Sequence, residues 1–141
     1  QWPDEKRTGS IWSDYGGVPG VELLLPYLYS EGVRRGRLSL ARLAQVLSSG
    51  PARFFGVDHR KGALKPGLDA DFVVFDEAAT WTVHARDLHN LNRYTPLEGR
   101  RLTGRVQKTY LRGRCVFERR ADGEEWLAPA GAGEFVRRGA P

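Results

Sequence analysis

The sequence predicts an α/β chain in which two or three helices precede a small β segment, with the boundary near residue 60. Before that point, apolar residues recur at the spacing of an amphipathic helix in two stretches. After it, the apolar runs become short and are separated by glycine, proline and aspartate, as in strands joined by turns. With 141 residues, 40% of them hydrophobic, the chain suits one domain or parts of two.

The first predicted helix covers residues 21–31, which read VELLLPYLYSE and follow a loop over residues 1–20. Three leucines share one face of this helix: Leu24, Leu25 and Leu28. Pro26 predicts a kink or a later start, because proline lacks the N–H that the helix ladder uses. Gly32 is the expected end of the helix.

The second predicted helix begins at Ser39, whose side chain suits the N-cap position. Its apolar residues follow at i, i+3, i+6 and i+7: Leu40, Leu43, Val46 and Leu47. The helix is expected to end at residues 48–50, which read SSG. Pro51 then suits the first position of another short helical turn, closed by Gly56.

The β segment is expected to contain four strands, at residues 72–75, 80–83, 106–111 and 114–118. The last two form a predicted hairpin that turns at Arg112 and Gly113. From Ala128 onward the chain is rich in alanine, glycine and proline, and we expect it to lie loosely over the surface.

The charge pattern favours a solvated surface over a nucleic-acid interface. The net charge is +5, but the arginines occur as scattered pairs rather than as one cluster. The longest aliphatic run is residues 23–25, far too short for a membrane span. We therefore expect neither a nucleic-acid nor a membrane partner. The single cysteine, Cys115, excludes an internal disulfide and indicates a reducing, cytoplasmic compartment.

No residue pattern predicts a catalytic centre or a metal site within the chain. His59, His84 and His89 lack the spacing of metal ligands, so structural or surface roles are favoured for all three. Cys115 lies in a predicted strand, where a buried small hydrophobic role is favoured over that of a nucleophile. We expect no catalytic and no metal-binding residue here.

Asp69 and Asp71 stand one residue apart in the stretch KGALKPGLDADFVVFD. Such a pair could bind a hard cation. However, Asp69 follows a turn and Asp71 directly precedes an apolar run, which is typical of a strand entering from solvent. The turn-and-strand interpretation is favoured.

Three blocks of sequence carry a family resemblance, which covers about residues 11–120. These are GVPGVELLLPYLYSEGVRRGRLSLARLAQVLSSGPARFFG, the stretch KGALKPGLDADFVVFD, and NLNRYTPLEGRRLTGRVQKTYLRGRCVFE. In this order they resemble the C-terminal third of cyclic-amide hydrolases, the allantoinase, dihydroorotase and hydantoinase branch of the amidohydrolase superfamily. Within that branch, GVELLLPYLYSEGV and TPLEGRRLTGRV look most like allantoinase.

The resemblance implies a fold, the C-terminal fragment of a metal-dependent (β/α)8 hydrolase barrel with its small β-sandwich. Residues 1–60 would be the end of the barrel, meaning its last loop and outer helices. Residues 61–141 would supply the C-terminal strands of the sandwich and the tail. Asp69 and Asp71 would then lead into a sandwich strand, far from the metals. The helix over residues 40–47 would lack its barrel partner, so we expect the isolated chain to aggregate or associate.

The resemblance also implies a reaction, the hydrolytic opening of a hydantoin-type ring of a small cyclic amide or ureide. The family's metal ligands and catalytic aspartate match no position here, so the chain holds no cofactor itself; two zinc ions are implied for a full-length, homo-oligomeric enzyme. Because the chain begins at Gln1 and contains no methionine, we expect it to be part of a longer polypeptide. Open alternatives are a dihydroorotase, a dihydropyrimidinase or hydantoinase, and a non-catalytic module derived from the fold.

Gly16 and Gly17 are the candidate substrate-binding residues. They lie in the stretch YGGVPGVE, residues 15–22, which aligns with a loop whose backbone hydrogen-bonds the cyclic substrate in relatives. Glycine lets main-chain groups approach a planar ring closely. The hydantoinase branch tends to have asparagine where Gly16 stands, which argues against that substrate class. A plain turn before the helix remains the alternative.

Overall fold

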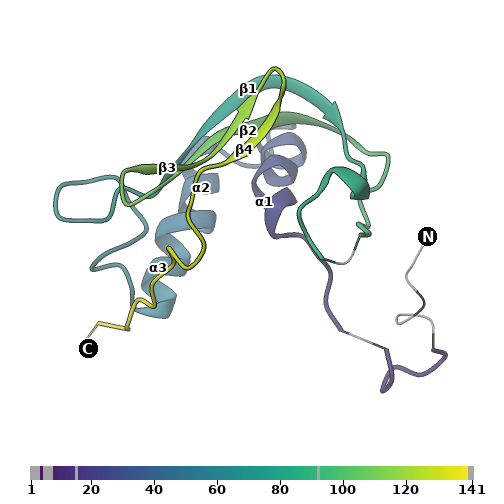
Figure 1. Ribbon diagram of the computed structural model, residues 1–141, viewed down its shortest axis with the longest axis horizontal. Helices are drawn as coiled ribbons and strands as arrows, with labels where there is room; N and C mark the ends of the chain where they lie inside the picture. Colours follow the sequence, from purple (N-terminus) through teal and green to yellow (C-terminus); the bar gives the residue numbers. More distant parts are fainter. Residues whose placement is uncertain (1–3, 5–7, 15, 92, 140–141) are drawn as a thin grey trace.

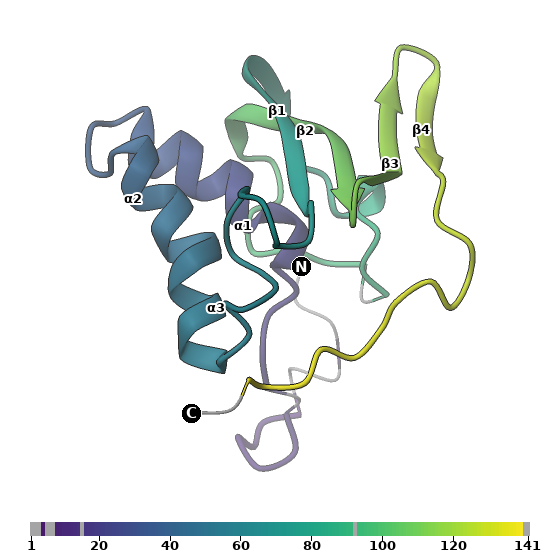
Figure 2. The ribbon, with the colours of Figure 1, turned by 90° about the vertical axis from the view of Figure 1, so that its left-hand side faces the viewer.

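The computed structural model describes residues 4, 8–14, 16–91 and 93–139. A four-stranded antiparallel sheet arches over the first helix, and the other helices lie to one side of it (Figure 1). Turned by a right angle, the helices and the strands separate into two groups (Figure 2). The helical part thus precedes the sheet along the chain, as predicted. None of the described helices has the length and apolar character needed to cross a membrane.

The first helix, α1 (Val21–Leu28), begins where predicted and contains Pro26. It continues into a wider turn, η2 (Tyr29–Val33), so the predicted stop at Gly32 is wrong. The predicted apolar face is also wrong, because Leu23 is 2% exposed whereas Leu24 is 49% exposed. The sheet rather than the leucine run decides the buried side: Leu23 packs with residues that flank and form the strands.

The second and third predicted helices form one continuous rod, α2 (Leu40–Ala44), η3 (Gln45–Ser49) and α3 (Gly50–Phe55). Ser39 caps it as predicted, accepting a hydrogen bond from the Arg42 N–H at 3.1 Å. The predicted break at residues 48–50 is wrong. Pro51 has no N–H to donate, and the wide turn η3 before it places proline where a helical bond is already displaced. The rod ends at Gly56, as predicted.

The four strands are β1 (Phe72–Thr82), β2 (Arg101–Leu111), β3 (Arg114–Arg120) and β4 (Gly123–Trp126), in the order β1-β2-β3-β4. The hairpin at Arg112 and Gly113 is confirmed. The two strands predicted at residues 72–75 and 80–83 are one strand. Its pairing with β2 is irregular between Asp76 and Thr80, where the Asp76 side chain accepts hydrogen bonds from two following backbone N–H groups. Strand β4 was not predicted.

The core lies between α1 and the sheet. Leu23, Val83 and Leu102 form its buried centre, and four half-buried side chains surround them: Tyr27, Trp81, Leu88 and Leu97. Next to this core, Gly104 of β2 lies against the rings of Tyr29 and Phe75. A Cβ atom at this position would lie 2.5 Å from the Phe75 ring and 2.6 Å from the Tyr29 ring, so only glycine fits.

The tail after β4 follows the surface, as predicted, but it is tied down at several points. Arg112 donates to the Ala132 carbonyl at 2.8 Å, Glu134 pairs with Arg60, and the Gly139 N–H donates to the Gly56 carbonyl at 2.7 Å. The tail therefore joins the hairpin turn to the end of α3.

Candidate functional site

The glycine loop, residues 16–20, leads directly into α1. Gly16 and Gly17 are exposed, and an added Cβ atom at either position would meet nothing within 4 Å. Gly17 has a φ of +84°, a conformation that side-chain-bearing residues rarely adopt. The two glycines thus leave space on this side of the loop for an approaching molecule. Tyr15, which belongs to the same sequence stretch, lies outside the described residues.

The connection between β1 and β2, residues 83–100, lies against this loop. The buried side chain of Tyr94 donates its hydroxyl hydrogen to the Gly17 carbonyl at 3.4 Å. His89 contacts the carboxylate of Glu22, in the first turn of α1, through its backbone N–H at 2.9 Å and its Nδ1 atom at 3.0 Å. The connection therefore holds the loop and the helix start from one side.

Glu98 fastens this connection internally. It accepts hydrogen bonds from the Ala85 N–H at 2.6 Å and from His84 Nδ1 at 2.9 Å. The Ala85 N–H and then His84 hold the pKa of Glu98 below its usual value, because both stabilise the carboxylate. His84 and His89 thus have carboxylate partners. Within the described part of the chain, no three His, Cys, Asp or Glu residues are grouped so that they could hold a metal ion.

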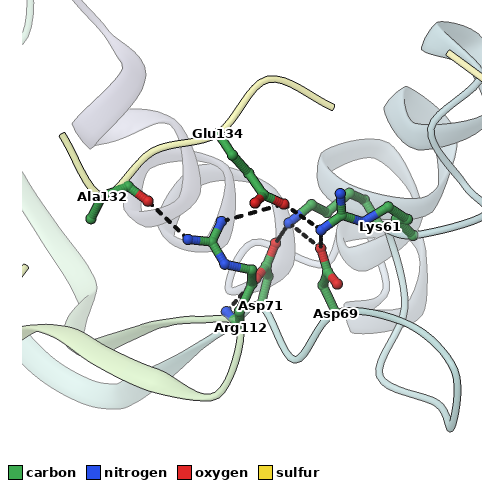
Figure 3. A network of polar contacts seen from close by, with 7 residues as sticks. Lys61, Asp69, Asp71, Arg112, Ala132 and Glu134 are labelled. Carbon is green, nitrogen blue, oxygen red and sulfur yellow. Dashed lines mark hydrogen bonds and ion pairs between the residues drawn. The ribbon is translucent and has the colours of Figure 1, made fainter. Parts of the chain in front are cut away.

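Asp69 and Asp71 take part in a network of ion pairs at the junction of helices and sheet (Figure 3). Lys61 Nζ lies 2.8 Å from Asp69 and also pairs with Asp71, while Arg60 lies 2.8 Å from Asp69. The Arg112 N–H donates to Asp71 at 2.7 Å. The hydrogen bond from Lys61 is the largest contribution that lowers the pKa of Asp69. Both carboxylates therefore form ion pairs with basic side chains of the same chain, which agrees with the turn-and-strand interpretation.

An apolar groove of about 640 Å³ lies between the start of α1, residues 88–90 and the sheet. The Arg105 guanidinium lies within it, 4.7 Å from the centre of the Trp81 ring. The Nε atom of Arg105 is buried and has no hydrogen-bond partner among the described residues. Burial lowers the pKa of Arg105, and the nearby Arg119 lowers it further. Gly16 and Gly17 do not line this groove.

Sequence reasoning identified the glycine pair but missed Tyr94, His89 and Arg105 as parts of these surroundings. Tyr94 and Gly17 are 77 residues apart, and no spacing rule connects them. Cys115 is half-buried rather than buried, with its Sγ 3.4 Å from the Phe117 carbonyl oxygen. The residue has no described part in either the loop or the groove.

A comparison with protein families matches residues 29–117 to the model described as "Amidohydrolase family". An L-hydantoinase of Paenarthrobacter aurescens is 36% identical over 137 residues, covering 96% of this chain and 29% of the relative. A D-phenylhydantoinase of Escherichia coli O1:K1 is 40% identical over 122 residues, covering 86% of this chain and 26% of the relative. The chain thus spans less than a third of the length of these relatives.

Solved structures agree. A D-hydantoinase (dihydropyrimidinase) from Thermus sp. superposes with a TM-score of 0.86 at 32% identity, over 96% of this chain and 29% of that one. The expectation of a closest likeness to allantoinase is not confirmed. The relatives match the hydantoinase and dihydropyrimidinase alternative better.

Proposed function

Because the chain belongs to the amidohydrolase family, we propose that it is the C-terminal part of a metal-dependent cyclic-amide hydrolase of the hydantoinase or dihydropyrimidinase kind. The reaction is the hydrolytic opening of a hydantoin or dihydropyrimidine ring at a C–N amide bond. Residues 1–60 complete the barrel, and residues 61–141 supply the sandwich strands and the tail.

The likeness to hydantoinases across nearly the whole chain carries this proposal. Gly16, in place of the asparagine common in that branch, argues against the hydantoinase substrate class. One position weighs less than 36% identity over 137 residues, so the hydantoinase alternative replaces the first expectation.

The metal ions implied by the family do not fit the residues that the structure describes. The described residues provide no group of three possible ligands, and cations of the protein already occupy Asp69 and Asp71. We assign the metals, and the aspartate that acts as general base and acid, to another part of a longer polypeptide.

The part assigned to this chain is recognition of the ring. A cyclic amide presents an N–H donor beside a C=O acceptor, and a backbone peptide presents the complementary pair. Gly16 and Gly17 are exposed and carry no side chain, so their amides can lie close to a planar ring. The glycine loop is therefore proposed as the substrate-contacting element.

The test uses the complete protein encoded by the reading frame that contains this chain. Hydrolysis of hydantoin, dihydrouracil, allantoin and dihydroorotate is followed by ultraviolet absorbance or product assay. We expect kcat/KM for hydantoin or dihydrouracil to exceed that for the other two by at least about tenfold, equivalent to about 1.4 kcal/mol. Faster hydrolysis of allantoin or dihydroorotate would overturn the substrate class. Absence of all four activities would favour a non-catalytic module.

A further inference from the structure

The connection between β1 and β2 contacts the glycine loop and the start of α1 through two side chains, those of Tyr94 and His89. We infer that Tyr94 is a positioning residue, which orients the backbone of the glycine loop toward the substrate. This inference rests on the function proposed above. His89 provides a second attachment, at the start of α1.

Tyr94 is suited to this role by its burial. Only 8% of the residue is exposed, so its ring is held by the protein, and its hydroxyl oxygen lies 3.4 Å from the Gly17 carbonyl oxygen, to which it donates. The Asn90 side chain donates to the Tyr94 carbonyl at 3.5 Å. The hydroxyl that contacts the Gly17 peptide thus belongs to a buried side chain.

This contact defines the orientation of one peptide plane. The Gly17 carbonyl and the Val18 N–H belong to the same trans peptide and point in opposite directions. Because Tyr94 binds the carbonyl, the Val18 N–H is directed away from Tyr94. Val18 as a whole residue is 55% exposed, so solvent reaches this part of the loop. A substrate carbonyl could accept a hydrogen bond there.

His89 restrains the other end of the loop. Its backbone N–H and ring Nδ1 both contact Glu22, at 2.9 Å and 3.0 Å, and its Nε2 atom lies 3.0 Å from Glu124 on β4. The contacts of Tyr94 with Gly17 and of His89 with Glu22 thus restrain the chain before α1 and within its first turn. A preorganised loop lowers the ordering cost of binding.

The test compares Tyr94→Phe with the unaltered complete protein. We expect KM for the cyclic amide to rise about three- to tenfold, the range for loss of one neutral hydrogen bond, while kcat changes less than about twofold. His89→Gln should have a smaller effect, because the backbone N–H to Glu22 remains. Tyr110→Phe is the matched control, since it removes a phenol hydroxyl from β2 and should leave both constants unchanged.

A second measurement separates this inference from the proposed function. Hydrogen exchange of the peptide covering residues 16–20 should be faster in Tyr94→Phe than in Tyr110→Phe, whether or not any substrate is hydrolysed. If the unaltered complete protein hydrolyses no cyclic amide, the proposed function is overturned, and the role of Tyr94 in holding the loop is not. Unchanged exchange in this peptide, or an unchanged KM in an active protein, would overturn the role of Tyr94.

Discussion

Two charged regions of the molecule differ in how completely their charges are matched. Around Asp69 and Asp71, each carboxylate meets a cation or a backbone donor from the same chain (Figure 3). In the groove, Arg105 lies over an aromatic ring, and its buried Nε atom has no acceptor within the described residues. The first region is complete by itself and joins helices, hairpin and tail. We expect the second to contribute less to the stability of this chain than the first.

The largest expected effect sets the scale for this comparison. Leu102 is 1% exposed and packs with Leu23 and Val83 in the core between α1 and the sheet. Leu102→Ala should lower the free energy of opening of β2 by roughly 2–5 kcal/mol, because it removes buried methyl groups and leaves a cavity. Native-state hydrogen exchange of β2 in the complete protein measures this. A smaller loss of exchange protection for Leu102→Ala than for Lys61→Met or Arg105→Met would contradict the assigned core.

The matched network is tested by Lys61→Met. This change leaves Asp69 and Asp71 without their shared partner, so exchange protection of the segment around residues 57–71 should fall by an amount smaller than for Leu102→Ala. Lys65→Met is the control, since Lys65 is exposed and makes no ion pair with any described residue. Equal losses of exchange protection in Lys61→Met and Lys65→Met would show that the ion pairs of Lys61 do not stabilise this segment.

The network also predicts a pH dependence. The pKa of Asp69 is lowered in the folded chain, chiefly by Lys61, and that of Glu134 is lowered chiefly by Arg60. Groups with lowered pKa values stabilise the fold fully above their ordinary values of 3.8 and 4.5 and lose this contribution as the pH falls through the folded values. Protection should therefore decrease on acidification below about pH 4.5, and less steeply in Lys61→Met.

A substitution of Arg105 in the groove should have the smallest effect on exchange protection. Arg105→Met removes a half-buried guanidinium but keeps much of its apolar contact with Trp81. We expect exchange protection of β2 to change by no more than about 0.5 kcal/mol, or to increase, because no acceptor is orphaned. Arg119→Met is the comparison, since Arg119 pairs with Glu124 and donates to the Val106 carbonyl at 3.3 Å. A loss for Arg105→Met greater than for Arg119→Met would reverse the comparison.

Part of the fold could be predicted because it depends on local signals. Ser39 caps its helix, Gly56 ends it, and Arg112 with Gly113 turns the hairpin, each through contacts within a few residues. The buried face of α1 could not be predicted, since three neighbouring leucines offer several faces and the position of the sheet selects Leu23. Strand β4 escaped notice because its residues, GEEW, carry no apolar alternation.

For the candidate site, the resemblance pointed to Gly16 and Gly17, and their contact with substrate remains a prediction. Residue patterns alone favoured structural roles for Asp69 and Asp71, and the ion pairs support that reading. The expectation that the isolated chain associates also remains a prediction. The exposed side chains of Phe54 and Phe55, at 79% and 65%, are in keeping with it.

By itself, the sequence determined the helix cap at Ser39, the helix end at Gly56 and the hairpin turn at Arg112 and Gly113, because caps and turns act over short distances. Its resemblance to known proteins indicated the family. The tertiary structure decided which polar atoms meet. Tyr94 contacts Gly17 across 77 positions, and His89 contacts Glu22 across 67. Such pairs depend on how the sheet packs on α1, and this packing is a property of the whole buried surface rather than of any short stretch of residues.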